Sequence, residues 1–288
     1  MITDVPKGSD FYKLGVEYSM MAQDAILELY ESLEGIDEEE EEGNSPSLHL
    51  ENSPGKLKIA LLLLHQGTDC FIKSRICEVS PYLLIQTNDL KSHKKSFEDY
   101  YSHDSSKLIE IHNTFTKFNL DDKFKGFHKE LRTNRNKISH SLARYLRLET
   151  QQVLEDINFV QAIFLKNGFM DERNTYMANL PGLSSLESSP FTFENIVWME
   201  FCILESFIKR SLLRKIYGFK KDGRKYYCPT CYTPDSPYDG KTAVLKDTDK
   251  LSCFLCKEEN DIIREDCQSH DCSSNVLDGN GYCSLCGY

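Results

Sequence analysis

The sequence predicts a mainly α-helical protein that ends in a small cysteine-rich β module. Apolar residues recur at helical spacing through most of residues 10–217, which indicates a helical bundle. Eight of the eleven cysteines lie in the last 61 residues, where apolar residues are few. The chain therefore divides into a helical part and a smaller module whose folding depends on its cysteines.

The composition of the 288 residues is that of a globular chain with a sizeable core, since 40% of them are hydrophobic. No run of 18 apolar residues is present, so we expect no membrane span and no membrane partner. The first 14 residues carry charges where a signal peptide needs an apolar core. We therefore expect a cytoplasmic protein.

Residues 1–56 are predicted to hold one helix, at 10–34, and an acidic linker at 35–55. Six consecutive carboxylates, from Asp37 to Glu42, cannot bury enough surface to order the linker. Two interpretations remain. The linker keeps the protein in solution, or it lies over a basic surface elsewhere and blocks it.

A helix at 57–78 is apolar nearly all round, which places it at the centre of a bundle. Its imidazole, His65, is interpreted as a hydrogen-bonded core residue. Asp69 and Lys73 have the spacing of an ion pair on one helix, although Asp69 could also support a site nearby.

The other helices and loops follow from periodicity and from capping residues. In chain order they are a loop at 88–95, a helix at 96–118, a helix from Asp121 or Asp122 to about Leu148, a helix from Thr150 to Lys166 that stops at Gly168, a long loop at 169–192, and a helix at 194–217 that ends in basic residues before Gly218.

The helix that ends near Leu148 carries a packed face and a chemical face. Leu131, Ile138, Leu142 and Tyr145 form an apolar stripe at helical spacing. A neighbouring arc carries a guanidinium, an amide, a hydroxyl and an imidazole, from Arg135, Asn136, Ser139 and His140. Imidazole transfers protons near neutral pH, and guanidinium binds phosphate through a fixed fork of donors.

Basic residues concentrate in the same helix despite the net charge of −11. Residues 1–56 carry 3 basic and 14 acidic side chains, whereas residues 57–219 carry 22 and 19. Within 123–147 there are eight basic side chains and one acid, Glu130. We expect this stripe to bind RNA phosphates, principally through Lys129, Arg132, Lys137 and Arg144; a solvated helix face with unbalanced charge is the alternative.

The hexapeptide RNKISH, residues 135–140, resembles the Arg-x(4–6)-His signature of the HEPN superfamily, and residues 59–76 resemble an early core helix of that family. The resemblance covers about residues 57–168. It implies an α-helical HEPN-like domain, at 57–219, with metal-independent endoribonuclease activity, acting as a homodimer and common among toxins and antiphage (abortive infection) defence proteins. An antitoxin or a phage-derived trigger would then be a partner.

In such an enzyme the ribose 2′-hydroxyl attacks its own phosphate, leaving a 2′,3′-cyclic phosphate and a 5′-hydroxyl on single-stranded RNA or tRNA. His140 is the candidate for proton transfer, Arg135 for holding the phosphate and Asn136 for orienting a ring or an oxygen. The reaction has two proton transfers, so two chains would each supply one histidine. Two alternatives remain, a catalytically inactive RNA- or nucleotide-binding sensor and a zinc-ribbon interaction module.

Residues 220–288 are predicted to form a double zinc ribbon with two structural Zn²⁺ sites. The first site combines Cys228 and Cys231 with Cys253 and Cys256. Each Cys-x2-Cys pair forms a knuckle whose two thiolates point the same way.

The second site combines Cys267 and Cys272 with Cys283 and Cys286. Its first pair departs from the usual knuckle by two residues, so His270 is the alternative ligand to Cys267 or Cys272. Disulfides are the less favoured interpretation of these cysteines, because no export signal is evident. Four thiolates leave no open position for water, so no catalytic metal is expected.

Overall fold

The computed structural model describes residues 2–32, 54–86, 96–140, 146–180, 193–218, 224–232 and 241–287. The acidic residues 37–42 and the expected loop at 88–95 lie outside them. The chain divides into two compact units, Met1–Lys166 and Asn167–Tyr288. This division differs from the boundaries expected at 56/57 and 219/220, because the N-terminal helix packs within the first unit and the last helices group with the cysteine-rich module.

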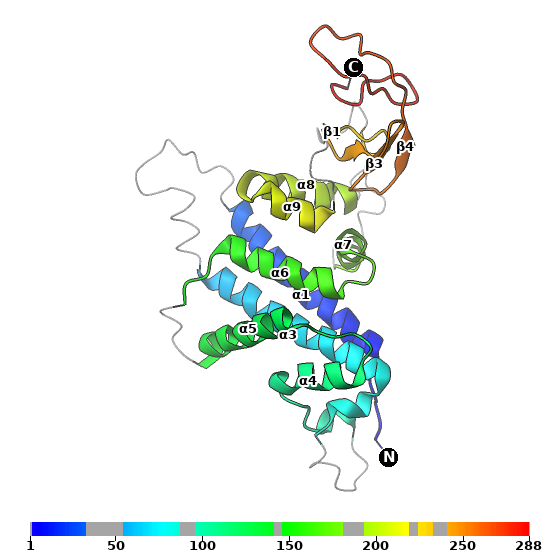
Figure 1. Cartoon of the computed structure of the whole chain (residues 1–288). Coiled ribbons are helices and arrows are strands. Elements are labelled where there is room, and N and C mark those ends of the chain that lie inside the picture. Colours follow the sequence, from blue (N-terminus) through cyan, green and yellow to red (C-terminus); the bar gives the residue numbers. More distant parts are fainter. Residues whose placement is uncertain are drawn as a thin grey trace, which may run out of the picture. The chain divides into compact units, whose positions relative to one another are not determined.

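The first unit is built around one long central helix, α3 (Pro54–Val79), which contacts each of the other α-helices described in that unit. These are α1 (Gly8–Glu31), α4 (Ser105–Phe115), α5 (Asp122–His140) and α6 (Thr150–Phe164) (Figure 1). Two short 3₁₀ helices, Pro81–Leu84 and Phe97–Asp99, precede α4. The central position expected for the apolar helix at 57–78 is thereby confirmed.

Small residues allow α1 and α3 to pack closely along their length. A Cβ added at Gly67 of α3 would lie 3.2 Å from the backbone oxygen of Gly15 in α1. The hydroxyl of Ser74 donates a hydrogen bond of 2.8 Å to the backbone oxygen of Gly8. The two helices therefore meet nearly backbone to backbone.

We expect Gly15→Ala to lower the free energy of unfolding by about 1–3 kcal/mol through overpacking. The new Cβ would lie 2.6 Å from Cδ1 of Phe71, whose ring is buried and stacks on Phe164 at 5.2 Å. The matched control is Gly126→Ala in α5, where an added Cβ meets nothing within 4 Å. That change should raise the free energy of unfolding by about 0.5–1 kcal/mol, because alanine favours the helix over glycine. Urea denaturation measures the change in unfolding free energy of each variant. Changes of the same sign in the two variants would contradict the close packing at Gly15.

Helices α4, α5 and α6 lie close to their expected positions, with corrections at their ends. Asp121 caps α5, because its Oδ1 accepts a hydrogen bond of 2.8 Å from the backbone N–H of Phe124. Residues 146–149 are not helical, so α5 ends before the expected Leu148; Leu142 and Tyr145 lie outside the described residues. Helix α4 begins only at Ser105, because residues 96–104 form a 3₁₀ turn and extended chain.

In the second unit, the long loop expected at 169–192 is wrong in its first half, since α7 spans Phe169–Ala178. Its composition is polar, but Phe169, Met170, Arg173 and Met177 are buried. Gly168, expected to end the preceding helix, has a φ of +81° and instead leads into α7, since α6 already ends at Phe164. Residues 181–192 lie outside the described part of the chain.

The helix expected at 194–217 is broken into α8 (Phe193–Phe207) and α9 (Arg210–Tyr217). Gly218, with a φ of +73°, ends α9 in the left-handed conformation that favours glycine. Arg173 of α7 is 1% exposed and pairs with Glu200 of α8, its Nε donating to Oε2 at 3.2 Å. Burial and the nearby Glu200 carboxylate raise the pKa of Tyr217 well above its ordinary value.

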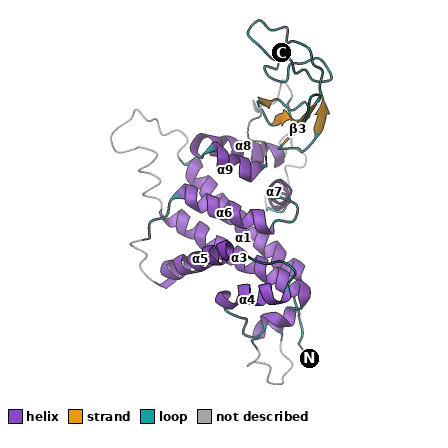
Figure 2. Ribbon diagram, in the orientation of Figure 1, coloured by secondary structure: helices purple, strands orange, loops and turns teal. Residues whose placement is uncertain are grey.

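A four-stranded antiparallel sheet follows, in the order β1-β2-β3-β4. Its strands are orange in Figure 2. The strands are β1 (Lys225–Tyr226), β2 (Ala243–Leu245), β3 (Lys250–Cys253) and β4 (Glu259–Asp261). The expected class, mainly helical with a small C-terminal β module, is confirmed. Among the described residues, no helix combines the length and apolar character needed to cross a bilayer.

Candidate functional site

The first four-cysteine cluster assembles at the ends of the sheet. Cys253 ends β3 opposite Ala243 of β2, and Cys228 comes two residues after the end of β1. The Sγ atoms of Cys228 and Cys256 are 3.7 Å apart, and those of Cys231 and Cys253 are 3.9 Å apart. All four sulfurs lie within 4.8 Å of one another. The predicted grouping of these cysteines is confirmed.

The second cluster contains Cys267, Cys272, Cys283 and Cys286. Cys267 and Cys286 approach to 3.6 Å between sulfurs, and Cys272 and Cys283 to 3.7 Å. The two extra residues of the first knuckle fit into a turn, in which the N–H of Cys272 donates to the backbone oxygen of Ser269 at 3.1 Å. His270 is exposed and is not a member of the cluster, so the choice of four cysteines is confirmed.

Both clusters have the dimensions of a tetrahedral thiolate site. Zinc–sulfur bonds of about 2.3 Å imply sulfur–sulfur edges of about 3.8 Å, and the sulfur–sulfur distances of 3.6–3.9 Å in the two clusters match this value. A disulfide would bring two sulfurs to about 2.05 Å. The two sites could therefore hold metal ions, and zinc agrees with their chemistry.

Backbone N–H groups point at the sulfurs, as expected around thiolate ligands. Leu255 and Cys256 donate to Cys253 Sγ at 3.3 and 3.4 Å, and Leu285 donates to Cys283 Sγ at 3.4 Å. Burial alone would raise the pKa of Cys283, but backbone N–H donors and the neighbouring thiols lower the pKa to about 6. These donors favour the ionised form that binds metal.

In the first unit, α5 presents a row of polar and basic residues to solvent. Lys125, Lys129, Arg132, Asn136 and His140 recur at intervals of four and three residues, so they lie within about 80° around the helix axis. Arg132 is half-buried, and the other four are exposed. Lys137 is exposed on another side of the helix, and Arg144 lies outside the described residues. The face therefore carries two of the four expected RNA-binding residues, Lys129 and Arg132. It also carries two of the three expected catalytic residues, Asn136 and His140.

A pocket of about 480 Å³ opens where this row meets α4. Its α5 lining is Lys125, His128, Lys129 and Arg132, and α4 contributes Asn113 and Thr114 among others. Glu110 is the acidic residue of the lining. Three cationic side chains and amide and hydroxyl groups around one hollow make a surface that attracts phosphate.

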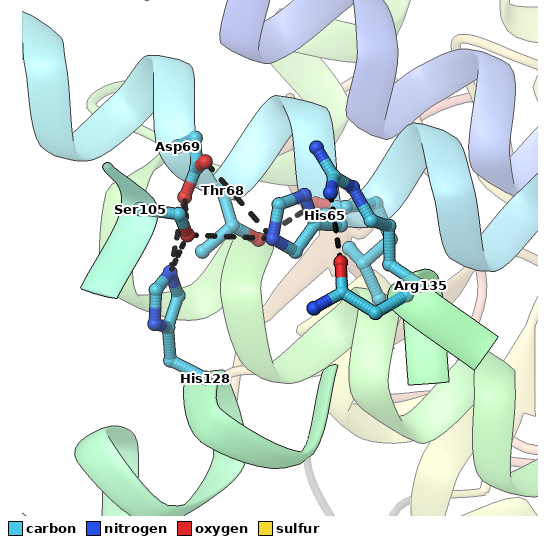
Figure 3. A network of polar contacts seen from close by, with 8 residues as sticks. His65, Thr68, Asp69, Ser105, His128 and Arg135 are labelled. Carbon is cyan, nitrogen blue, oxygen red and sulfur yellow. Dashed lines mark hydrogen bonds and ion pairs between the residues drawn. The ribbon is translucent and has the colours of Figure 1, made fainter. Parts of the chain in front are cut away.

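The three candidate catalytic residues do not form one cluster within a chain. Arg135 is half-buried, and its Nη1 donates to Asn136 Oδ1 at 2.8 Å. Five residues of helix separate the directions of Arg135 and His140 by about 140°. His140 is exposed and makes no hydrogen bond or ion pair with another described residue. Arg135 instead extends towards His65 of α3 (Figure 3).

A second polar cluster, which the sequence did not predict, lies beneath the pocket. His65 and Asp69 of α3, Ser105 at the start of α4 and His128 of α5 converge (Figure 3). His128 Nε2 lies 3.0 Å from Asp69 Oδ1, in place of the Lys73 pairing that the spacing suggested. The expectation that His65 is a buried, hydrogen-bonded histidine is confirmed. The neighbours Ser105 and His128 were missed, because they come from other helices.

The electrostatics of this cluster set the charge of its members. Burial lowers the pKa of His65, and nearby His128, Arg135 and Arg132 lower it further against the opposing charge of Asp69. Burial tends to raise the pKa of Asp69, but the hydrogen bond with His128, the neighbouring imidazoles and the Ser105 hydroxyl hold it below its ordinary value. The cluster thus combines an ionised carboxylate with a neutral imidazole.

Fold and sites together define a mainly helical protein of two units, the second of which contains two four-cysteine clusters that could hold metal ions. Comparison of the chain with protein-family models, with curated proteins and with solved structures gives no match.

Proposed function

We propose that the solvent-facing row of α5 binds RNA and that a homodimer of this protein cleaves it as a metal-independent endoribonuclease. The observation that carries the proposal is the continuity of one helix face, from the basic pocket at Lys125, Lys129 and Arg132 to Asn136 and His140. From residue 125 to residue 140 an α-helix rises about 22 Å, which is long enough to follow several nucleotides. The HEPN-like hexapeptide at 135–140 supports the same reading.

In the proposed reaction, the phosphate backbone lies along the basic residues and the scissile phosphate reaches the end of α5. His140 transfers a proton to or from the reacting oxygens. Arg135 stabilises the charge on the phosphorane, and Asn136 holds the Arg135 guanidinium through the bond at 2.8 Å. DNA lacks the 2′-hydroxyl, so it would bind without being cut.

Arg135 and His140 diverge around α5, which counts against a site within one chain, so the proposal requires a dimeric site. One chain does not present both groups to a single phosphate, whereas two α5 helices that meet near their C-terminal ends could offer one group each. A dimer also supplies the two imidazoles that two proton transfers need. We further propose that both four-cysteine sites bind structural Zn²⁺, and that the protein is a toxin or antiphage effector.

We expect purified protein to cleave single-stranded RNA without added Mg²⁺ and to leave 5′-hydroxyl ends. His140→Ala should lower the cleavage rate by about 10²–10⁴-fold, the usual contribution of a general acid or base. The matched control is His270→Ala, which removes another exposed imidazole outside the clusters. The buffer omits chelators, which would strip the cysteine sites. Equal cleavage by wild type and His140→Ala would overturn the assignment.

A second candidate is RNA binding without cleavage, favoured by the absence of any contact between Arg135 and His140 among the described residues. The same purified protein distinguishes RNA cleavage from RNA binding without cleavage. RNA that stays intact but binds more weakly to a Lys129→Ala/Arg132→Ala variant, with a shallower dependence on salt, would indicate a binding module. Unchanged binding by that variant would leave the zinc ribbons as the interaction module.

A further inference from the structure

We propose that His65, Asp69 and His128, together with the hydroxyl of Ser105, form a third metal site, which binds a divalent transition-metal ion such as Zn²⁺ within the first unit. This site belongs to the first unit, shares no residue with the cysteine clusters of the second unit and does not depend on the proposed nuclease activity. The reasons are the identity of the donor atoms, their spacing and their burial.

Four donor atoms of suitable kinds converge from three helices. The Ser105 Oγ lies 2.9 Å from Asp69 Oδ1, 3.3 Å from His128 Nε2 and 3.4 Å from His65 Nε2. His65 and Asp69 are four residues apart on α3, so they project from the same side of the helix. Two imidazole nitrogens, a carboxylate oxygen and a hydroxyl oxygen make a donor set that zinc and other first-row metals accept.

The spacing of these atoms is that of a small tetrahedron. Metal bonds of about 2.0–2.1 Å imply edges of about 3.3–3.4 Å between neighbouring ligand atoms. The edges to Ser105 run from 2.9 to 3.4 Å, His128 Nε2 to Asp69 Oδ1 is 3.0 Å, and His65 Nε2 to Asp69 Oδ2 is 4.0 Å. His65, Asp69 and His128 offer ligand atoms that all lie within 4.8 Å of one another. The edges to Ser105 and the edge between His128 and Asp69 are thus close to those of a ligand tetrahedron, and His65 would have to move closer to Asp69 to complete the coordination.

Burial distinguishes this cluster from an ordinary group of surface side chains. His65 is 2% exposed, His128 3% and Asp69 7%. A buried carboxylate between two imidazoles needs either protons or a cation to balance its charge. His128 also lines the basic pocket, which gives an ion a route from solvent. An ion here would hold α3, α4 and α5 together and would add positive charge beneath the phosphate-binding hollow.

The test counts metal ions in the full-length chain after expression in zinc-supplemented medium and gel filtration. We expect three ions per chain for wild type and two for Asp69→Asn, which keeps the shape of the side chain but is a poor ligand. The matched control is His112→Ala, which removes another fully buried histidine of the same unit, one that bonds to Asn113; it should retain three. Circular dichroism verifies that each variant is folded.

Cobalt substitution of wild type and of Ser105→Ala gives a second readout that does not depend on a destabilised variant. Four-thiolate sites give intense sulfur-to-cobalt charge-transfer bands. A site with nitrogen and oxygen ligands has no such bands and adds only weaker ligand-field bands. We expect wild type to show both sets of bands. Ser105→Ala should keep the charge-transfer bands of the cysteine sites and change only the ligand-field bands. Two ions per chain in wild type, or spectra that contain thiolate sites alone, would overturn the proposal and leave the cluster as a hydrogen-bond network.

Discussion

A Cys253→Ser chain is expected to lose the fold of its four-stranded sheet while the helices of the first unit stay folded. Cys253 is 2% exposed and ends β3 within the first cysteine cluster. A structural zinc site contributes about 10–16 kcal/mol to the folding of a small module, as much as the whole stability of a typical domain. The sheet has strands of only two to four residues and cannot replace that contribution by apolar burial.

Hydrogen exchange followed by mass spectrometry measures this effect region by region. Amides in 241–261 should exchange far faster in the variant than in wild type, and one fewer zinc ion should be bound. The matched control is Cys202→Ser on α8, an exposed cysteine outside both clusters, which should change neither quantity. Full protection of the sheet in metal-stripped wild type would contradict a structural role for the ion.

Arg173→Met is expected to lower the free energy of unfolding of the second unit by about 3–5 kcal/mol, because it removes the guanidinium that pairs with the buried carboxylate of Glu200. Arg173 is 1% exposed and Glu200 4% exposed, so water cannot replace the lost guanidinium. Nε of Arg173 donates to the Glu200 carboxylate at 3.2 Å, and a second bond from Nη2 completes a bidentate pair. Guanidinium denaturation followed by fluorescence of the single tryptophan, Trp198 in α8, measures the change.

The double variant Arg173→Met/Glu200→Leu is the control for this prediction. Replacing both members of a buried ion pair with apolar groups of similar volume is often neutral or stabilising. We therefore expect most of the lost stability to return. A double variant as unstable as Arg173→Met would show that the arginine acts through packing, for example on the ring of Tyr176, and not through the charge of Glu200.

Local patterns predicted the parts of this protein that depend on short stretches of chain. Helical periodicity located α1, α3, α5 and α6, and the carboxylate of Asp121 marked the start of α5. Cysteine spacing predicted both metal clusters, including the second one with its wider knuckle. These features were readable because a turn of helix and a metal knuckle each involve residues close together in sequence.

The missed features depend on contacts between distant residues. Helix α7 carries a polar sequence, and its buried Arg173 finds a partner only when α8 packs beside it. The break between α8 and α9 at residues 208–209 likewise contains no glycine or proline, the residues that usually indicate the end of a helix. Periodicity alone therefore gave a loop in the first case and one continuous helix in the second.

The sequence by itself determined the helical class, the two cysteine sites and the basic character of α5, since each follows from residue types at fixed local intervals. Only the tertiary structure decided that Arg135 extends towards His65, away from His140, and that His128 and Ser105 join His65 and Asp69. The physical reason is that the four residues of this cluster come from three helices, α3, α4 and α5. Their donor atoms meet because α4 and α5 both pack on α3, which no local pattern encodes.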